Sequence, residues 1–83
     1  MDSPFAVLLR RAALQRRLET DPLRGKSWAG YVRGLRRAHH GEQFGTETEH
    51  ELWVSASEST DSLRAALGRG YCAGLLLTAQ EPG

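Results

Sequence analysis

Hydrophobic and polar positions along this chain follow helical spacing, and no segment alternates convincingly with the two-residue period of a β-strand. The clearest pattern begins at Trp28 and continues through Tyr31, Val32 and Leu35, which would share one face of a helix. The chain carries four helical segments, at about residues 3–18, 27–40, 47–57 and 61–77. Together they predict an all-α fold, a small bundle of antiparallel hairpins.

Capping residues mark where several of these helices begin. Ser3 followed by Pro4 is typical of an N-cap and a first helical residue. Thr46 and Glu49 have the spacing of a capping box. The last helix is expected to be capped by one of three residues, Ser59, Thr60 or Asp61.

The stretch between the first two helices contains a proline and a glycine, which commonly interrupt helices. Pro22 and Gly25 predict a break there, so the second helix is expected to begin at Ser27 after a link of about eight residues. The whole chain, residues 1–83, is expected to be one domain, with residues 78–83 as a frayed tail.

A short pattern occurs twice, as GYVRGL at residues 30–35 and GYCAGL at residues 70–75. When the two helices are aligned by their apolar arcs, the matching glycines fall on different faces, so we interpret the match as coincidence. Five glycines inside helices would cost about 4–5 kcal/mol, which close approach of a neighbouring helix could offset. The residues expected to form that close contact are Ala66, Gly70 and Gly74. The alternative is that the fourth helix ends near Gly68.

The first and fourth helices each carry a second apolar stripe. A monomer of 83 residues has little interior to cover both stripes, which predicts a homodimer built on these helices. The alternative is that these stripes stay partly exposed, as much apolar protein surface does. The residues expected at the self-association interface are Val7, Leu14, Leu18, Cys72, Leu75 and Leu76.

Charge is distributed unevenly along the chain. The overall net charge is only +1, yet residues 1–40 carry +6 and residues 41–83 carry −5. The halves could neutralise each other, or the first half could bind an acidic partner. A single cysteine and no secretory signal favour the cytoplasm, although the arginine-rich first segment also has features of a mitochondrial presequence. No apolar run is long enough to predict a membrane span.

The candidate chemistry is weak. Glu47 and His50 have the spacing of one helix of a di-iron site, but the matching residues on other helices are missing. Cys72 lies among leucines with no basic neighbour, so we expect a buried structural thiol. We therefore predict a protein without catalytic residues or cofactors, and metal binding is the third choice of function.

The surface most suited to binding is the basic side of the second helix. Arginine clusters there opposite the apolar arc, and further cations precede the helix. We predict a small binding or regulatory protein that engages an acidic partner protein, with nucleic acid phosphates as the alternative. The residues expected to contact the partner are Arg24, Lys26, Arg33, Arg36, Arg37 and His40.

Overall fold

The computed structural model describes residues 4–76 and contains four α-helices and one short 3-10 turn. The all-α bundle predicted from the sequence is confirmed. Ser3 and residues 77–83, which include the expected tail, lie outside the described residues. The elements are α1 (Pro4–Leu18), α2 (Pro22–His40), η1 (Gly41–Gln43), α3 (Glu47–Ala56) and α4 (Ser62–Leu75).

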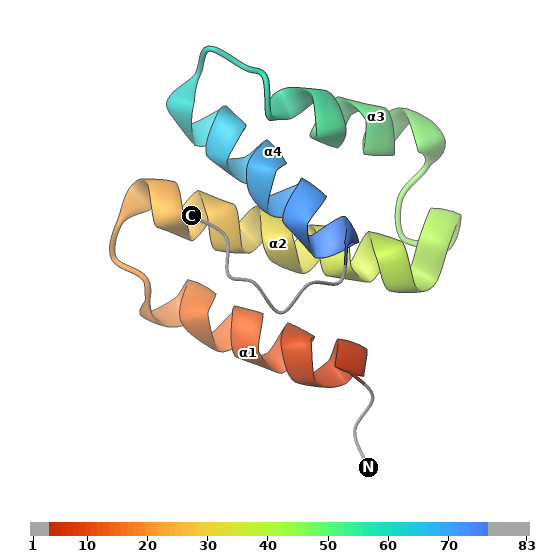
Figure 1. The fold of residues 1–83 in the computed structure, drawn as a ribbon, viewed down its shortest axis with the longest axis horizontal. Coiled ribbons are helices and arrows are strands. Elements are labelled where there is room, and N and C mark those ends of the chain that lie inside the picture. The colour runs from red at the N-terminus through yellow and green to blue at the C-terminus, as the bar shows by residue number, and fades with distance from the viewer. Residues whose placement is uncertain (1–3, 77–83) are drawn as a thin grey trace.

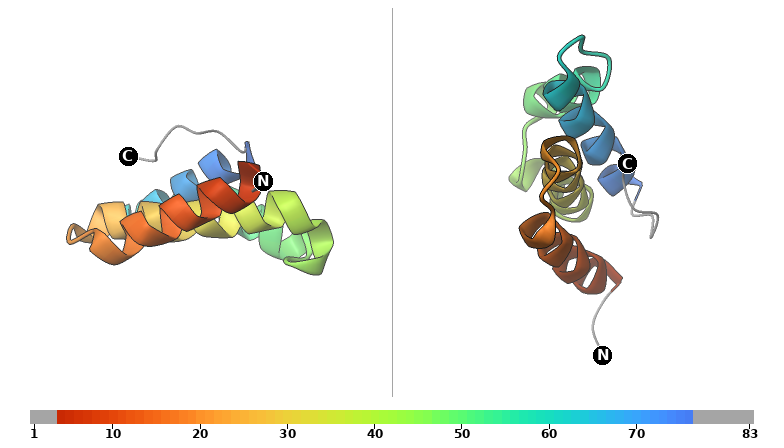
Figure 2. Two further views of the ribbon diagram at one scale, coloured as in Figure 1. Left: turned by 90° about the horizontal axis from the view of Figure 1, so that it is seen from below. Right: turned by 90° about the vertical axis from the view of Figure 1, so that its left-hand side faces the viewer.

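The helices lie side by side in the order α1, α2, α4, α3, as Figure 1 shows. Helices that follow each other along the chain run in opposite directions and form two hairpins, α1–α2 and α3–α4. The two hairpins meet along α2 and α4, which run in the same direction and share the most extensive contact. The result is a thin slab of 42 × 31 × 17 Å, seen from the end in Figure 2, with α1 and α3 at its outer edges.

Helix α2 begins at Pro22, five residues earlier than the sequence predicts. Asp21 is its N-cap, and the Asp21 carboxylate accepts a hydrogen bond from the backbone N–H of Leu23 at 2.8 Å. Proline is tolerated at the first helical position because its missing N–H would have no partner inside the helix anyway. The link to α1 is therefore only residues 19–21, shorter than the eight or so residues predicted from the sequence.

Glycines allow the backbones of α2 and α4 to touch. A Cβ atom at Gly30 would overlap the backbone carbonyl of Leu67, and one at Gly70 would overlap the carbonyl of Ser27. Gly34 and Gly74 are seated in the same way against the backbone around Tyr71 and Tyr31. Neighbouring glycines four residues apart thus form the flat surface that such close helix packing needs.

These contacts obey a pseudo-twofold relation with an offset of forty residues. Gly30 meets Leu67 and Tyr71, while Gly70 meets the residues forty positions before them, Ser27 and Tyr31. The matching glycines therefore occupy equivalent places in one interface, which shows that our interpretation of the repeat as coincidence was wrong. The alignment by apolar faces gave the wrong result because backbone contact determines the glycine face. The large apolar side chains of the two helices point in different directions, so they do not mark that face.

The repeat is longer than the glycine pattern alone. Residues 20–35 read TDPLRGKSWAGYVRGL and residues 60–75 read TDSLRAALGRGYCAGL, so half of the aligned residues are identical. Asp61 caps α4 as Asp21 caps α2, with its carboxylate 2.9 Å from the backbone nitrogen of Leu63. Each half of the molecule is thus one capped helical hairpin.

The hydrophobic core follows the two central helices. Its largest buried members are Trp28, Tyr31 and Leu35 of α2, which pack with Ala12 of α1, and Tyr71 of α4 is equally buried. Helix α4 continues to Leu75, so the alternative in which it ends near Gly68 is wrong.

Candidate binding groove

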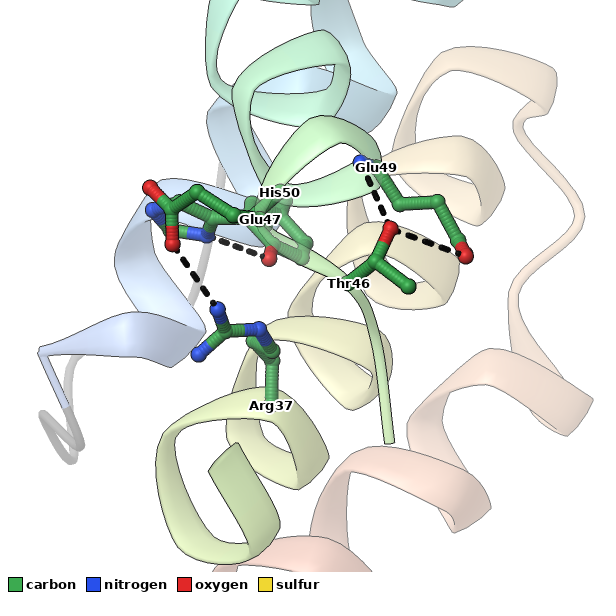
Figure 3. A network of polar contacts seen from close by, with 6 residues as sticks. Arg37, Thr46, Glu47, Glu49 and His50 are labelled. Atoms are coloured by element: carbon green, nitrogen blue, oxygen red, sulfur yellow. Dashed lines mark hydrogen bonds and ion pairs between the residues drawn. The ribbon is translucent and has the colours of Figure 1, made fainter. Parts of the chain in front are cut away.

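The N-terminus of α3 is fastened to α2 and α4 by polar contacts (Figure 3). The Thr46 hydroxyl accepts a hydrogen bond from the backbone N–H of Glu49 at 3.2 Å, as the capping-box spacing predicts. Arg37 of α2 forms an ion pair with Glu47 at 3.5 Å, and His50 Nδ1 lies 2.7 Å from the Tyr71 hydroxyl. These contacts hold α3 against the central helices.

Arg37 is therefore occupied within the protein. Its side chain is only 14% exposed, and its Cδ packs 3.5 Å from the position of a Cβ at Gly45. An arginine that is covered by its own chain and paired with Glu47 has little surface left for a partner. The geometry favours a structural role for Arg37 over the partner contact predicted from the sequence.

Arg33 also turns toward α3. Its guanidinium carbon lies 4.6 Å from the centre of the Trp53 ring and 5.6 Å from that of Phe44, and it forms a longer ion pair with Glu49 at 3.9 Å. Cation–π contacts of this kind hold an arginine over an aromatic face. Arg33 remains 40% exposed, so it forms the border between the α3 contacts and the open surface.

Several cations line an open hollow on one face of the slab. It encloses about 350 Å³ and lies over α1 and α2, with α3 and α4 contributing its far wall. Its lining mixes cations, which come from α1 as well as α2, with apolar side chains. The lining residues are Arg16, Lys26, Ala29, Val32, Arg33, Arg36, Phe44, Trp53 and Leu67.

A second hollow continues this surface toward the outside of α1. It shares Arg16, Val32 and Arg36 with the first and adds Ala13 and Arg17. Among the described residues, no acidic side chain lines either hollow. In that same part of the chain, Arg16, Lys26 and Arg36 make no ion pair. We call the two hollows together the basic groove; its cations are Arg16, Arg17, Lys26 and Arg36, with Arg33 at its border.

The structure divides the partner-binding residues expected from the sequence. Lys26 and Arg36 line the basic groove, whereas Arg24 is exposed in the first turn of α2 and lines neither hollow. The His40 ring stands edge-on to the Phe5 ring, with 5.6 Å between centroids, in a ring cluster at the end of α2.

Sequence reasoning missed the contribution of α1. Arg16 and Arg17 lie in the last turn of that helix, and the short link at residues 19–21 brings the turn beside α2. Recognition of Asp21 and Pro22 as a helix start would have shown that the link is short and that these arginines lie near Lys26.

The residues expected at a self-association interface lie in two places. Val7, Leu14 and Leu18 are 48%, 49% and 64% exposed, on the side of α1 opposite the residues that pack into the core, such as Leu8 and Ala12. Leu76 is 74% exposed just beyond α4, while Cys72 and Leu75 are half-buried. Because α2 lies between α1 and α4, these residues do not form one continuous stripe.

Titratable groups in the core are held in their neutral forms. Burial raises the pKa of the Tyr71 phenol, an effect that Arg37 and Arg33 partly oppose. Burial also raises the pKa of the Cys72 thiol, which keeps it protonated and unreactive near neutral pH. Within residues 4–76 there is no group of three or more histidine, cysteine or acidic side chains that could hold a metal ion.

Comparison with known protein families, with curated proteins and with solved structures finds no match for this chain. In the described part of the chain, no helix is both long and apolar enough to cross a membrane. The class of protein that the fold defines is thus a small four-helix bundle made of two similar hairpins, and the site is a basic groove whose cations all come from the first of them.

Proposed function

We propose that this protein acts by binding and that its basic groove takes an acidic segment of a partner protein. The observation that carries the proposal is a groove with four cations, Arg16, Arg17, Lys26 and Arg36, and no acidic lining residue among those described. Such a surface attracts carboxylates, and arginine binds them through two parallel hydrogen bonds.

The apolar lining residues favour a protein segment over single-stranded nucleic acid. Val32 and Leu67 would contact aliphatic side chains interspersed among the acidic residues of such a segment. Bases would need free aromatic faces, yet Trp53 already stacks on Tyr71 and carries Arg33 over its ring. Phosphates of a duplex remain the competing ligand, which the experiment must separate.

The test compares two labelled probes by fluorescence anisotropy. One is a glutamate-rich peptide with a few leucines, and the other is a short DNA duplex of similar total charge. We expect the peptide to bind more tightly than the duplex. Arg36→Glu and Lys26→Glu should each weaken peptide binding roughly tenfold, because each replaces an attraction by a repulsion in the groove.

Arg69→Glu is the matched control, because Arg69 is an exposed arginine of α4 that lines neither hollow. It changes the net charge equally and should weaken binding less than about twofold. Equal losses for Arg69→Glu and Arg36→Glu would show that only total charge matters and would overturn the proposal. Tighter binding of the duplex would replace the acidic protein by nucleic acid as the ligand.

A further inference from the structure

The two outer edges of the slab carry opposite charges. Helix α1 forms one edge and has four arginines without an acidic residue between positions 4 and 18. Helix α3 forms the other edge and has three glutamates without lysine or arginine between positions 47 and 56. Since α2 and α4 separate these edges, the charges of α1 and α3 cannot neutralise each other within one copy.

Part of the acidic edge is used internally and part is not. Glu47 and Glu49 face α2, where they pair with Arg37 and Arg33. Glu51 and Glu58 are exposed farther along the same edge and make no ion pair within the described residues. Arg17 on the opposite edge is likewise exposed without an ion pair in that part of the chain.

Both edges also expose apolar side chains beside these charges. On α1 these are Val7, Leu14 and Leu18, which follow one another at helical spacing along the outer side. On α3 they are Leu52 and Val54, which are 58% and 38% exposed. Each edge therefore combines a charge with apolar surface, and the charges are complementary.

We propose that the α1 edge of one copy docks on the α3 edge of a second copy, so that copies associate head to tail. The two docking surfaces are different, so every copy keeps one free edge after each contact and association continues beyond a dimer unless a ring closes. A single helix edge is smaller than the ~800 Å² per partner of stable complexes, so the contact is weak and concentration-dependent. The contact shares Arg17 with the basic groove and needs neither Lys26 nor Arg36.

Sedimentation velocity or light scattering tests this proposal over a range of protein concentration. We expect the average mass of the full chain to rise beyond two copies between about 20 and about 500 µM and to fall again when salt is added. A protein that stays monomeric throughout, or a mass that levels off at two copies, would overturn the head-to-tail contact.

Charge-swapped variants identify the edges. Leu14→Glu/Arg17→Glu places two glutamates on the α1 docking surface, where they would meet the glutamates of α3, and Glu51→Arg/Val54→Arg places two arginines on the α3 docking surface, where they would meet the arginines of α1, so each variant alone should stay monomeric. An equal mixture of the two variants should associate, because every contact between unlike copies is again complementary. Circular dichroism verifies that both variants are folded, and Arg69→Glu should associate as the unaltered chain does. Association of either variant alone, or failure of the mixture of folded variants, would contradict the proposal.

Discussion

The two hairpins share one plan but differ in how closely their helices pack. In the first, the bulky Trp28 of α2 lies in the core between α2 and α1. Forty residues on, the equivalent position is Gly68, where the backbone of α4 touches the backbone at Ala56 and Ser57. Both halves share the aspartate-capped helix start and the glycine face. The separation between the outer helix and the central helix differs from one half to the other. Backbone contact thus fixes the centre of the molecule, while side-chain size sets the position of each edge.

The largest expected effect comes from filling the shared interface. Gly30→Ala and Gly70→Ala each place a methyl group on a carbonyl of the other helix, and α2 and α4 must separate to admit it. Each should cost at least ~4 kcal/mol of unfolding free energy, a large part of the stability of a small domain. Urea denaturation measures the loss.

Gly25→Ala is the control for those two variants. A Cβ there has no neighbour within 4 Å, although Gly25 lies in the same helix as Gly30. Alanine should leave stability unchanged or raise it by about 0.5–1 kcal/mol through its better helix propensity. If Gly30→Ala changed the unfolding free energy as little as Gly25→Ala does, the backbone contact would be contradicted.

The next effect distinguishes the two hairpins at equivalent positions. Position 28 needs a large side chain, whereas position 68 needs a residue without one. Trp28→Ala leaves a cavity between α1 and α2 and should cost about 3–5 kcal/mol. Gly68→Ala adds volume against the backbone of the α3 end and should cost about 1–3 kcal/mol, since the turn after α3 can shift. Thermal unfolding followed by circular dichroism compares them. Tolerance of Gly68→Ala without any loss would mean that α3 is not held against α4.

A smaller effect tests the equivalence of the helix starts. Asp21→Ala and Asp61→Ala each remove one capping carboxylate whose hydrogen bonds to the next turn match in length. Each should lower the unfolding free energy by about 1 kcal/mol, and the two losses should agree. A loss at only one of the two positions would break the proposed symmetry of the hairpins.

The smallest effect is a pH dependence confined to alkaline solution. Because the pKa of Tyr71 is raised, the folded protein holds the phenol proton more tightly than the unfolded chain. Stability from this residue is therefore fully present below about pH 10 and falls as pH rises through the folded pKa.

Urea unfolding measured across this alkaline range detects the change. Cys72→Ala serves as the parent protein, so that the thiol, whose pKa is also raised, does not contribute. Adding Tyr71→Phe should make the decline shallower. If stability fell equally with and without the Tyr71 hydroxyl, the attribution of the alkaline loss to Tyr71 would be contradicted.

The sequence predicted most of the fold and less of the site. Helical periodicity and the capping residues identified the four helices, because those signals are local. Thr46 caps α3 as predicted, and of the three candidates for the last helix, Ser59, Thr60 and Asp61, the structure uses Asp61. The start of α2 was misjudged because Pro22 was interpreted as a break, although proline suits a first helical position. The basic side of the groove depends on how α1 lies against α2, and with a link of about eight residues Arg16 of α1 could not be placed in one groove with Arg36 of α2. Trp53 and Leu67 reach the groove only through the α2–α4 contact, which joins residues far apart in the sequence.

The most direct test of this account is the nuclear Overhauser pattern between α2 and α4. Parallel helices in backbone contact predict cross-peaks from the α-protons of Gly30 to the amide of Tyr71 and from those of Gly34 to the amide of Leu75. The symmetric set, from Gly70 to the amide of Tyr31, should appear as well. Absence of these cross-peaks, or cross-peaks that pair Gly30 with Gly74 and Gly34 with Gly70 as in an antiparallel contact, would contradict the central claim.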